Sequence, residues 1–348
     1  MFSLEKDLIE KAKKISPKFY KIIKSSLKVK NEQILIISDY GEKNRHLAPI
    51  FALGYYFAAK NKEFNVELLL QENKKGFMHS EKHISKALID LPKNSIVILS
   101  LSRKLGRFGD QKSFRNFCKE SGHRFISATG LGDAKTSHLD IFMEAIDTNY
   151  NRMKKKGLTI KKKLDKAKII EVRTDAGTNL TFNVEDKIAI ANIGEHYENG
   201  TGGNIPAGEV YIPPKGYYGV NGVAVIDGSI KTSGGAILLK EPIIIYIEEG
   251  KVVRMEGKDA KFLEETFQKF EDRARYPYRV RYVGELGIGI NPGAVLMGST
   301  IIDEKVLGTA HIAIGSNSWF GGDIKTIFHG DLVFKSPRIY LDGEKLEI

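Results

Sequence analysis

Five side chains that can bind a metal ion lie in the C-terminal part of this 348-residue chain, in short apolar segments broken by glycine: Glu209, Glu285, His311, His329 and Asp331. One residue separates His329 from Asp331, so on an extended strand both side chains point to the same face of a sheet. An imidazole and a carboxylate on one face can share a divalent ion. His311 lies in a second strand-like segment, residues 309–314, and is placed to supply a third ligand.

The donor types restrict the choice of metal. Two histidines and three carboxylates without a thiolate suit zinc, cobalt, manganese or iron. The one cysteine of the chain, Cys118, also excludes an intramolecular disulfide. Glu209 and Glu285 are the candidate catalytic residues, because a carboxylate that is not needed as a ligand can act as a general base.

Two further residues are candidates for substrate binding. His196 lies in the segment 194–198, and it is the remaining histidine nearest in sequence to the proposed ligands. Trp319 lies in a glycine-bounded loop after His311, where its ring can line a pocket. A lone histidine or tryptophan more often belongs to a core or a surface, so both assignments depend on the metal site itself.

The composition is that of a soluble globular protein rather than a membrane or disordered protein. The chain is 42% hydrophobic and 28% charged, and its length predicts two domains. The first residues are charged throughout and no apolar run approaches the roughly 20 residues of a membrane span, so we expect a cytoplasmic location. The net charge is +11, but no nucleic-acid-binding motif accompanies it, so nucleic acid is not an expected partner.

The N-terminal part predicts a doubly wound α/β domain over residues 1–150. Short apolar runs at 34–37, 65–70, 96–99 and 124–127 are typical of buried parallel strands, and helical patterns separate them. A first helix is expected over residues 3–26, interrupted at Pro17.

The rest of the chain changes character. Residues 151–166 are rich in lysine and predict a basic helix or linker. Residues 167–348 predict a β-rich α+β metal-binding domain, with a hairpin at 167–184 and a helix at 258–272. The expected fold is therefore an N-terminal α/β domain followed by a β-rich domain that carries all five candidate ligands.

Four segments, taken in order, resemble the C-terminal part of the aminopeptidase T family of metallo-aminopeptidases and their leucyl aminopeptidase-like relatives. They are residues 203–214 (GNIPAGEVYIPP), 284–294 (GELGIGINPGA), 303–322 (DEKVLGTAHIAIGSNSWFGG) and 329–332 (HGDL). The resemblance covers residues 165–345 and carries the ligand and catalytic pattern onto the five residues named above. It also implies a homodimer and a short-peptide or other small-molecule substrate.

One position departs from the peptidase pattern. Those peptidases have a tyrosine seven residues after the first histidine of the pattern, and here that position is Ser318. The same resemblance extends to a related 2,5-dihydroxypyridine dioxygenase, which uses two histidines and one carboxylate to hold iron.

Three hypotheses follow from the residues and the resemblance. The main one is a hydrolase that removes N-terminal residues from peptides, in which one or two zinc, cobalt or manganese ions activate water. The alternative is a ring-cleaving dioxygenase in which His311, His329 and Asp331 bind a single Fe(II) and leave positions open for substrate and dioxygen. The third is a binding or structural protein that has lost catalysis.

Overall fold

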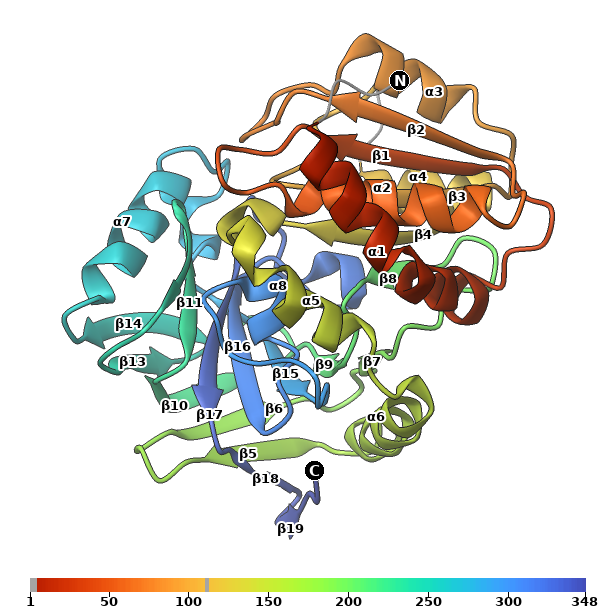
Figure 1. Cartoon of the computed structure of the whole chain (residues 1–348). Coiled ribbons are helices and arrows are strands. Elements are labelled where there is room, and N and C mark those ends of the chain that lie inside the picture. Colours follow the sequence, from red (N-terminus) through yellow and green to blue (C-terminus); the bar gives the residue numbers. More distant parts are fainter. Residues whose placement is uncertain (1–4, 110–112) are drawn as a thin grey trace. The chain divides into compact units, whose positions relative to one another are not determined.

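A computed structural model describes residues 5–109 and 113–348 of the chain. These residues form two compact units, and Figure 1 shows the elements of both. The first unit contains residues up to 147 together with 194–207, and the second contains 148–193 and 208–348. One unit has a parallel sheet and the other has antiparallel sheets, so the predicted fold class is confirmed. No helix in the described ranges combines the length and the apolar character needed to cross a membrane.

The sheet of the first unit has the order β2-β1-β3-β4-β8, and every neighbouring pair is parallel. The four long strands were predicted from their apolar runs, which are typical of strands covered on both faces. The fifth, β8, has the sequence Gly-Gly-Asn and carries no such signal. The strands are β1 (Ile34–Asp39), β2 (Val66–Gln71), β3 (Ile96–Leu101), β4 (Arg124–Thr129) and β8 (Gly202–Asn204).

Helices cover both faces of this sheet. The main ones are α1 (Lys6–Ile22), α2 (Leu47–Lys60), α3 (Lys82–Ile89), α4 (Phe114–Ser121) and α5 (Leu139–Ile146). Leu35, Val97 and Phe125 on one face form a core with buried side chains of α3 and α4. On the other face, the hydroxyl of Ser100 donates to the carbonyl of Ala48 in α2. The doubly wound arrangement follows from these two layers.

The predicted break at Pro17 is wrong. Helix α1 continues through this proline and passes into a π-helical turn at Ile23–Leu27. A proline removes the N–H that would normally bond to the carbonyl four residues earlier, that of Lys13. Here the hydroxyl of Ser16 donates to this carbonyl instead (2.9 Å), so the helix has a substitute for the missing bond. The predicted start at residue 3 lies outside the described residues.

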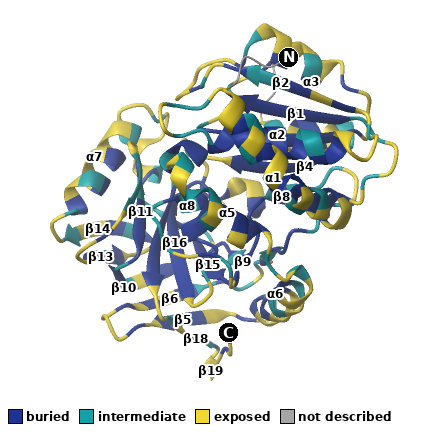
Figure 2. Cartoon of the chain, in the orientation of Figure 1, coloured by how far each residue is buried: buried dark blue, intermediate teal, exposed yellow. Residues whose placement is uncertain are grey.

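The second unit contains two seven-stranded antiparallel sheets. The first has the order β14-β13-β10-β6-β5-β18-β19 and the second has the order β12-β11-β17-β16-β15-β9-β7. The first consists of β5 (Ile169–Arg173), β6 (Asn179–Asn183), β10 (Val220–Ile226), β13 (Ile243–Glu248), β14 (Lys251–Glu256), β18 (Arg338–Leu341) and β19 (Glu344–Lys345). The second consists of β7 (Ile190–Asn192), β9 (Glu209–Ile212), β11 (Ser229–Thr232), β12 (Gly235–Leu238), β15 (Val283–Gly289), β16 (Thr309–Gly315) and β17 (His329–Lys335). The predicted hairpin is confirmed as β5 and β6. Figure 2 shows the central strands of the second sheet, β15 and β16, as buried along their whole length.

Three α-helices belong to the second unit, namely α6 (Tyr150–Leu164), α7 (Ala260–Glu271) and α8 (Thr300–Asp303). The predicted basic helix is therefore present as α6, but it is part of this unit rather than a separate linker. A side chain at Gly157 would meet Ile193 at 2.5 Å and Ile290 at 3.0 Å, so glycine lets the helix pack closely there. The predicted single boundary near residue 150 also differs from the observed division, since residues 194–207 return to the first unit.

Candidate functional site

The strand register of the second sheet places all five predicted ligands on one face. In an antiparallel sheet, residues that lie directly opposite each other project to the same side. Glu285 is opposite Ala313, which is opposite Asp331. His311 is opposite Gly287, and Glu209 is opposite Gly289. The predicted same-face relation of His329 and Asp331 is present on β17. Four neighbouring strands thus contribute acidic and imidazole groups to a common surface.

Glu285 lies between His311 with Glu209 and His329 with Asp331. Its Oε1 lies 3.3 Å from Nε2 of His311, and its Oε2 lies 3.8 Å from Nε2 of His329. His329 Nε2 is also 3.3 Å from Oδ1 of Asp331, while Oε2 of Glu209 is 3.8 Å from His311 Nε2. Donor atoms of Glu209, Glu285 and His311 lie within 4.8 Å of one another. The structure therefore brings all five residues together, with Glu285 at the centre.

Small residues make room on this face. A Cβ atom at Gly287 would lie 2.0 Å from Nε2 of His311, so the imidazole occupies the space of the missing side chain. A Cβ atom at Gly289 would lie 2.1 Å from the carbonyl oxygen of Val306, so the segment before β16 crosses close over β15. The glycines of the sequence Glu-Leu-Gly-Ile-Gly are required because other atoms fill the space that side chains would take.

Hydrogen bonds orient the more accessible histidine. Nδ1 of His329 lies 2.8 Å from the carbonyl of Ser316, and a proton donated to this carbonyl would leave Nε2 as the nitrogen facing the predicted metal site. The side chain of His329 is 26% exposed, whereas His311 is fully buried. Nδ1 of His311 has no hydrogen-bond partner within the described part of the chain.

The carboxylates shift the pKa of both imidazoles upward. Burial alone would lower the pKa of His329, but Asp331 and then Glu285 outweigh it and raise the pKa to about 9. Burial also opposes a charge on His311, yet its hydrogen bond and charge interaction with Glu285 raise its pKa. Burial would raise the pKa of Asp331, but His329 holds it below its usual range. The same negative potential that stabilises a proton on these rings would stabilise a divalent cation.

Three residues of the site were not predicted, namely Lys305, Glu304 and Asn192. Lys305 is fully buried, and its Nζ lies 2.5 Å from Oε1 of Glu209 and also contacts Glu304. Asn192 Nδ2 lies 3.5 Å from the same oxygen of Glu209. Burial, together with the charges of Glu209 and Asp331, raises the pKa of Glu304 well above its usual value. The one hint in the sequence is that the charged residues 303–305 stand between the apolar pairs 301–302 and 306–307.

The aromatic residue proposed for substrate binding lies against a predicted ligand. The ring of Trp319 is edge-on to that of His329, with centroids 4.8 Å apart, and Trp319 is 46% exposed. Asn317 holds this loop, because its Nδ2 donates to the carbonyl of Gly284 and its Oδ1 accepts from the N–H of Ile324. Ser318, which replaces the tyrosine of the peptidase pattern, begins the short 3₁₀ turn that carries Trp319.

His196 lies in the first unit, whereas the five ligands lie in the second. It is buried, and its backbone N–H donates to the carbonyl of Ser26. Its role in substrate binding stays a prediction. Asp303 caps the turn before α8 by accepting the N–H groups of residues 297–299, as a structural residue does.

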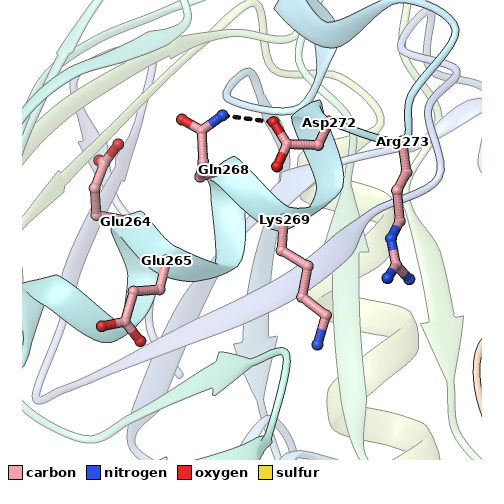
Figure 3. Close-up of a pocket in the computed structure, with 6 residues that line it drawn as sticks. All are labelled: Glu264, Glu265, Gln268, Lys269, Asp272 and Arg273. Atoms are coloured by element: carbon pink, nitrogen blue, oxygen red, sulfur yellow. Dashed lines mark hydrogen bonds between the residues drawn. The ribbon is translucent and has the colours of Figure 1, made fainter.

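A surface hollow is lined by side chains of α7 and of the two residues after it, and by none of the candidate ligands (Figure 3). The side chains around it are acidic, basic and amide groups, and Gln268 donates to Asp272 within the helix. This composition is typical of a solvated helix face. The hollow therefore adds no second reactive group to the site on the sheet.

The donor set fits a divalent metal of intermediate hardness. Two imidazole Nε2 atoms and several carboxylate oxygens converge, and the chain's single thiol, Cys118, is buried in the first unit. Such nitrogen and oxygen donors suit Fe(II), Mn(II), Co(II) or Zn(II). The expectation of a divalent metal is supported at this level.

Comparisons with known proteins give a consistent result. The family model NicX, described as 2,5-dihydroxypyridine 5,6-dioxygenase, matches residues 137–347, which include all five predicted ligands. The structure of 2,5-dihydroxypyridine dioxygenase from Pseudomonas putida matches with a TM-score of 0.73 and 17% identity, over 97% of this chain and 96% of that chain. A ureidoglycine-glyoxylate aminotransferase from Bacillus subtilis aligns at a TM-score of only 0.20 and 14% identity, over 35% of this chain and 33% of that chain. No sequence among the curated proteins matches.

These findings correct the main hypothesis from the sequence. A hydrolase of the aminopeptidase T type was expected, with metal-activated water as its nucleophile, and nothing in the comparisons supports a metalloprotease. The ring-cleaving alternative agrees with the matched model, and the departure at Ser318 was the residue that pointed away from peptide hydrolysis. Because the family model matches more than half of the residues of this chain, the chain belongs to the 2,5-dihydroxypyridine 5,6-dioxygenase family.

Proposed function

We propose that the protein is an Fe(II)-dependent dioxygenase that opens the ring of a dihydroxylated pyridine or a closely related hydroxylated aromatic compound. The observation that carries this proposal is the family match over residues 137–347, within which His311, His329 and Asp331 share one face of a sheet. Two histidines and one carboxylate that leave coordination positions open are the donor set of non-haem Fe(II) oxygenases.

In the proposed reaction one carbon–carbon bond of the ring breaks, and both atoms of dioxygen enter the product. The electrons come from the ring, so no external reductant is needed. Iron(II), when bound, would supply adjacent open positions for a ring hydroxyl group and dioxygen.

The side chains around the metal ligands have distinct proposed roles. Glu209 is a candidate to take the proton of a ring hydroxyl group, since its Oε1 is held by Lys305 while its Oε2 faces His311. Glu285 lies beside Nε2 of both histidines, the atoms proposed to hold iron, so its carboxylate is placed to balance the charge of the ion. Trp319 is half-exposed beside His329, and its indole ring offers a flat surface for a flat substrate.

The test is oxygen consumption by protein loaded anaerobically with Fe(II) and supplied with 2,5-dihydroxypyridine. We expect about one dioxygen per ring opened, and His329→Ala to lower the rate by more than about 100-fold, since even an outer partner of a metal ligand is worth 10–100-fold. His83→Ala, at an exposed histidine of the first unit, is the matched control and should retain the rate.

The proposal is overturned if iron-loaded protein consumes no oxygen with 2,5-dihydroxypyridine or with dihydroxybenzenes. It is also overturned if His329→Ala and His83→Ala behave alike, because the catalytic metal would then not depend on the proposed ligand.

A further inference from the structure

A fully buried lysine lies directly beside the proposed metal ligands. Nζ of Lys305 is 2.5 Å from Oε1 of Glu209 and contacts Oε1 of Glu304. Burial disfavours the charged ammonium, but the two carboxylates outweigh burial and raise the pKa of Lys305. A buried lysine of this kind is rare unless it is paired, so its charge has a structural or functional reason.

The backbone places this ammonium with precision. Lys305 follows the single-turn helix α8, and its carbonyl accepts the N–H of Asn291 (2.8 Å) just after β15. The missing side chain of Gly289 lets residues 305 and 306 cross directly over the strand. Gly289 is also the register partner of Glu209. The lysine therefore reaches Glu209 from above the same face that carries the histidines.

We propose that Lys305 is a positioning residue, a fixed cation that takes the place a second metal ion would have and keeps Glu209 out of the metal coordination shell. The inference rests on the proposed single-ion function of the site. In this arrangement Glu209 forms an ion pair with Lys305. The remaining four candidate residues surround one ion, namely His311, His329, Asp331 and Glu285.

The charges and distances support this assignment. A second divalent ion bound to Glu209 would lie only a few ångströms from the ammonium in a poorly solvated place, where like charges repel strongly. Oε1 of Glu209 is already engaged by Lys305 at 2.5 Å and approached by Asn192 at 3.5 Å. The other oxygen of Glu209, Oε2, lies 3.8 Å from Nε2 of His311, which is a longer distance than the contact of Oε1 with Lys305. Glu209 is thus held in a fixed orientation by groups that are not metal ions.

The experiment measures how many Mn(II) ions bind per chain, by elemental analysis and calorimetric titration, without any substrate. We expect one ion for the natural protein and one for Glu209→Gln, with a dissociation constant within about threefold, since the amide removes only a carboxylate that is not a ligand. Lys305→Met should bind two ions per chain, because Glu209 then becomes available. In Lys305→Met combined with Glu209→Gln the number should return to one.

Lys335→Met, at an exposed lysine of β17, is the matched control and should keep one ion. Lys305→Met leaves two buried carboxylates without their cation and is expected to be less stable. If it does not fold, the comparison of Glu209→Gln with the natural protein decides the matter.

The inference is overturned if Glu209→Gln weakens Mn(II) binding by more than about tenfold, if folded Lys305→Met still binds one ion, or if the natural protein binds two. None of these results depends on ring cleavage. A protein that binds one Mn(II) as expected but consumes no oxygen with iron would overturn the proposed function alone.

Discussion

At the scale of single residues, the site depends on a glycine without a side chain as well as on its candidate ligands. His311 can lie close against β15 only because residue 287 has no side chain. The ring then sits within 3.3 Å of Glu285 and 3.8 Å of Glu209. A methyl group at position 287 would lie 2.0 Å from Nε2, and a fully buried ring in a close-packed interior has little room to move.

Gly287→Ala should therefore weaken metal binding by at least about tenfold and cost about 1–3 kcal/mol of stability, as overpacking of a core does. Titration with Mn(II) and urea unfolding measure the two effects. The control is Gly234→Ala in the same unit, where an added Cβ meets only Thr232 Oγ1 at 3.7 Å. Equal metal affinity in the two variants would contradict the steric role of Gly287.

The convergence of the candidate ligands could be predicted from the sequence, whereas their charged neighbours could not. His329 and Asp331 share a face because of their spacing, and a two-residue repeat is a local property of a strand. Lys305 and Glu304 lie in a short turn, where no periodicity identifies the buried side. A lysine is ordinarily read as solvated. Its burial depends on the crossing over Gly289, which is a contact between distant parts of the chain.

At the scale of elements, apolar runs predicted the buried strands of the first unit, but β8 was not predictable. Its pairing with β4 comes from residues 202–204, after the chain has already built part of the second unit. Strands with only glycine and asparagine have no apolar pattern, so their partner decides their conformation. The same segment, residues 194–207, contains His196, whose side chain is buried.

The pKa of His196 is lowered to about 4, first by burial and then by the charge of Arg115, while an unfolded histidine titrates near 6.5. Between these two values the unfolded chain binds a proton that the folded chain does not, so stability falls as the pH falls. The loss approaches about 3 kcal/mol near pH 4. We expect His196→Gln to lose less stability than the natural protein between pH 7 and pH 4.5 in calorimetric unfolding. An identical loss in both proteins would show that His196 is not the group responsible.

At the scale of the whole molecule, the chain passes between its two compact units three times, after residues 147, 193 and 207. The predicted single boundary near 150 captured only the first of these. The composition of the sequence changes only once, near residue 150, so it indicates one boundary. Residues 194–207 belong to the first unit because β8 pairs with β4, and this pairing leaves no mark on the composition. Gly202 fits there because a side chain would meet the ring of Phe125 at 2.2 Å.

A fragment of residues 1–147 should therefore have an incomplete sheet. The N–H of Phe125 donates to the carbonyl of Thr201 in the whole chain, so we expect its hydrogen exchange to be at least about tenfold faster in the fragment. Amides of the central strand β1 are the internal control and should exchange alike. Joining residues 194–207 to the fragment through a flexible linker should restore the protection of Phe125. Unchanged exchange in the fragment would contradict the structural role of β8.

The packing of His311 over Gly287 also bears on how such a centre can arise or be transplanted. The imidazole of His311 fills the space that a side chain at position 287 would need. A larger residue at position 287 would therefore clash with the ring, and a smaller residue at position 311 would leave a void. A designer who grafts the ligands onto another antiparallel sheet must therefore copy the vacant position together with the imidazole. Lineages that abandon the metal are expected to exchange both members of the pair.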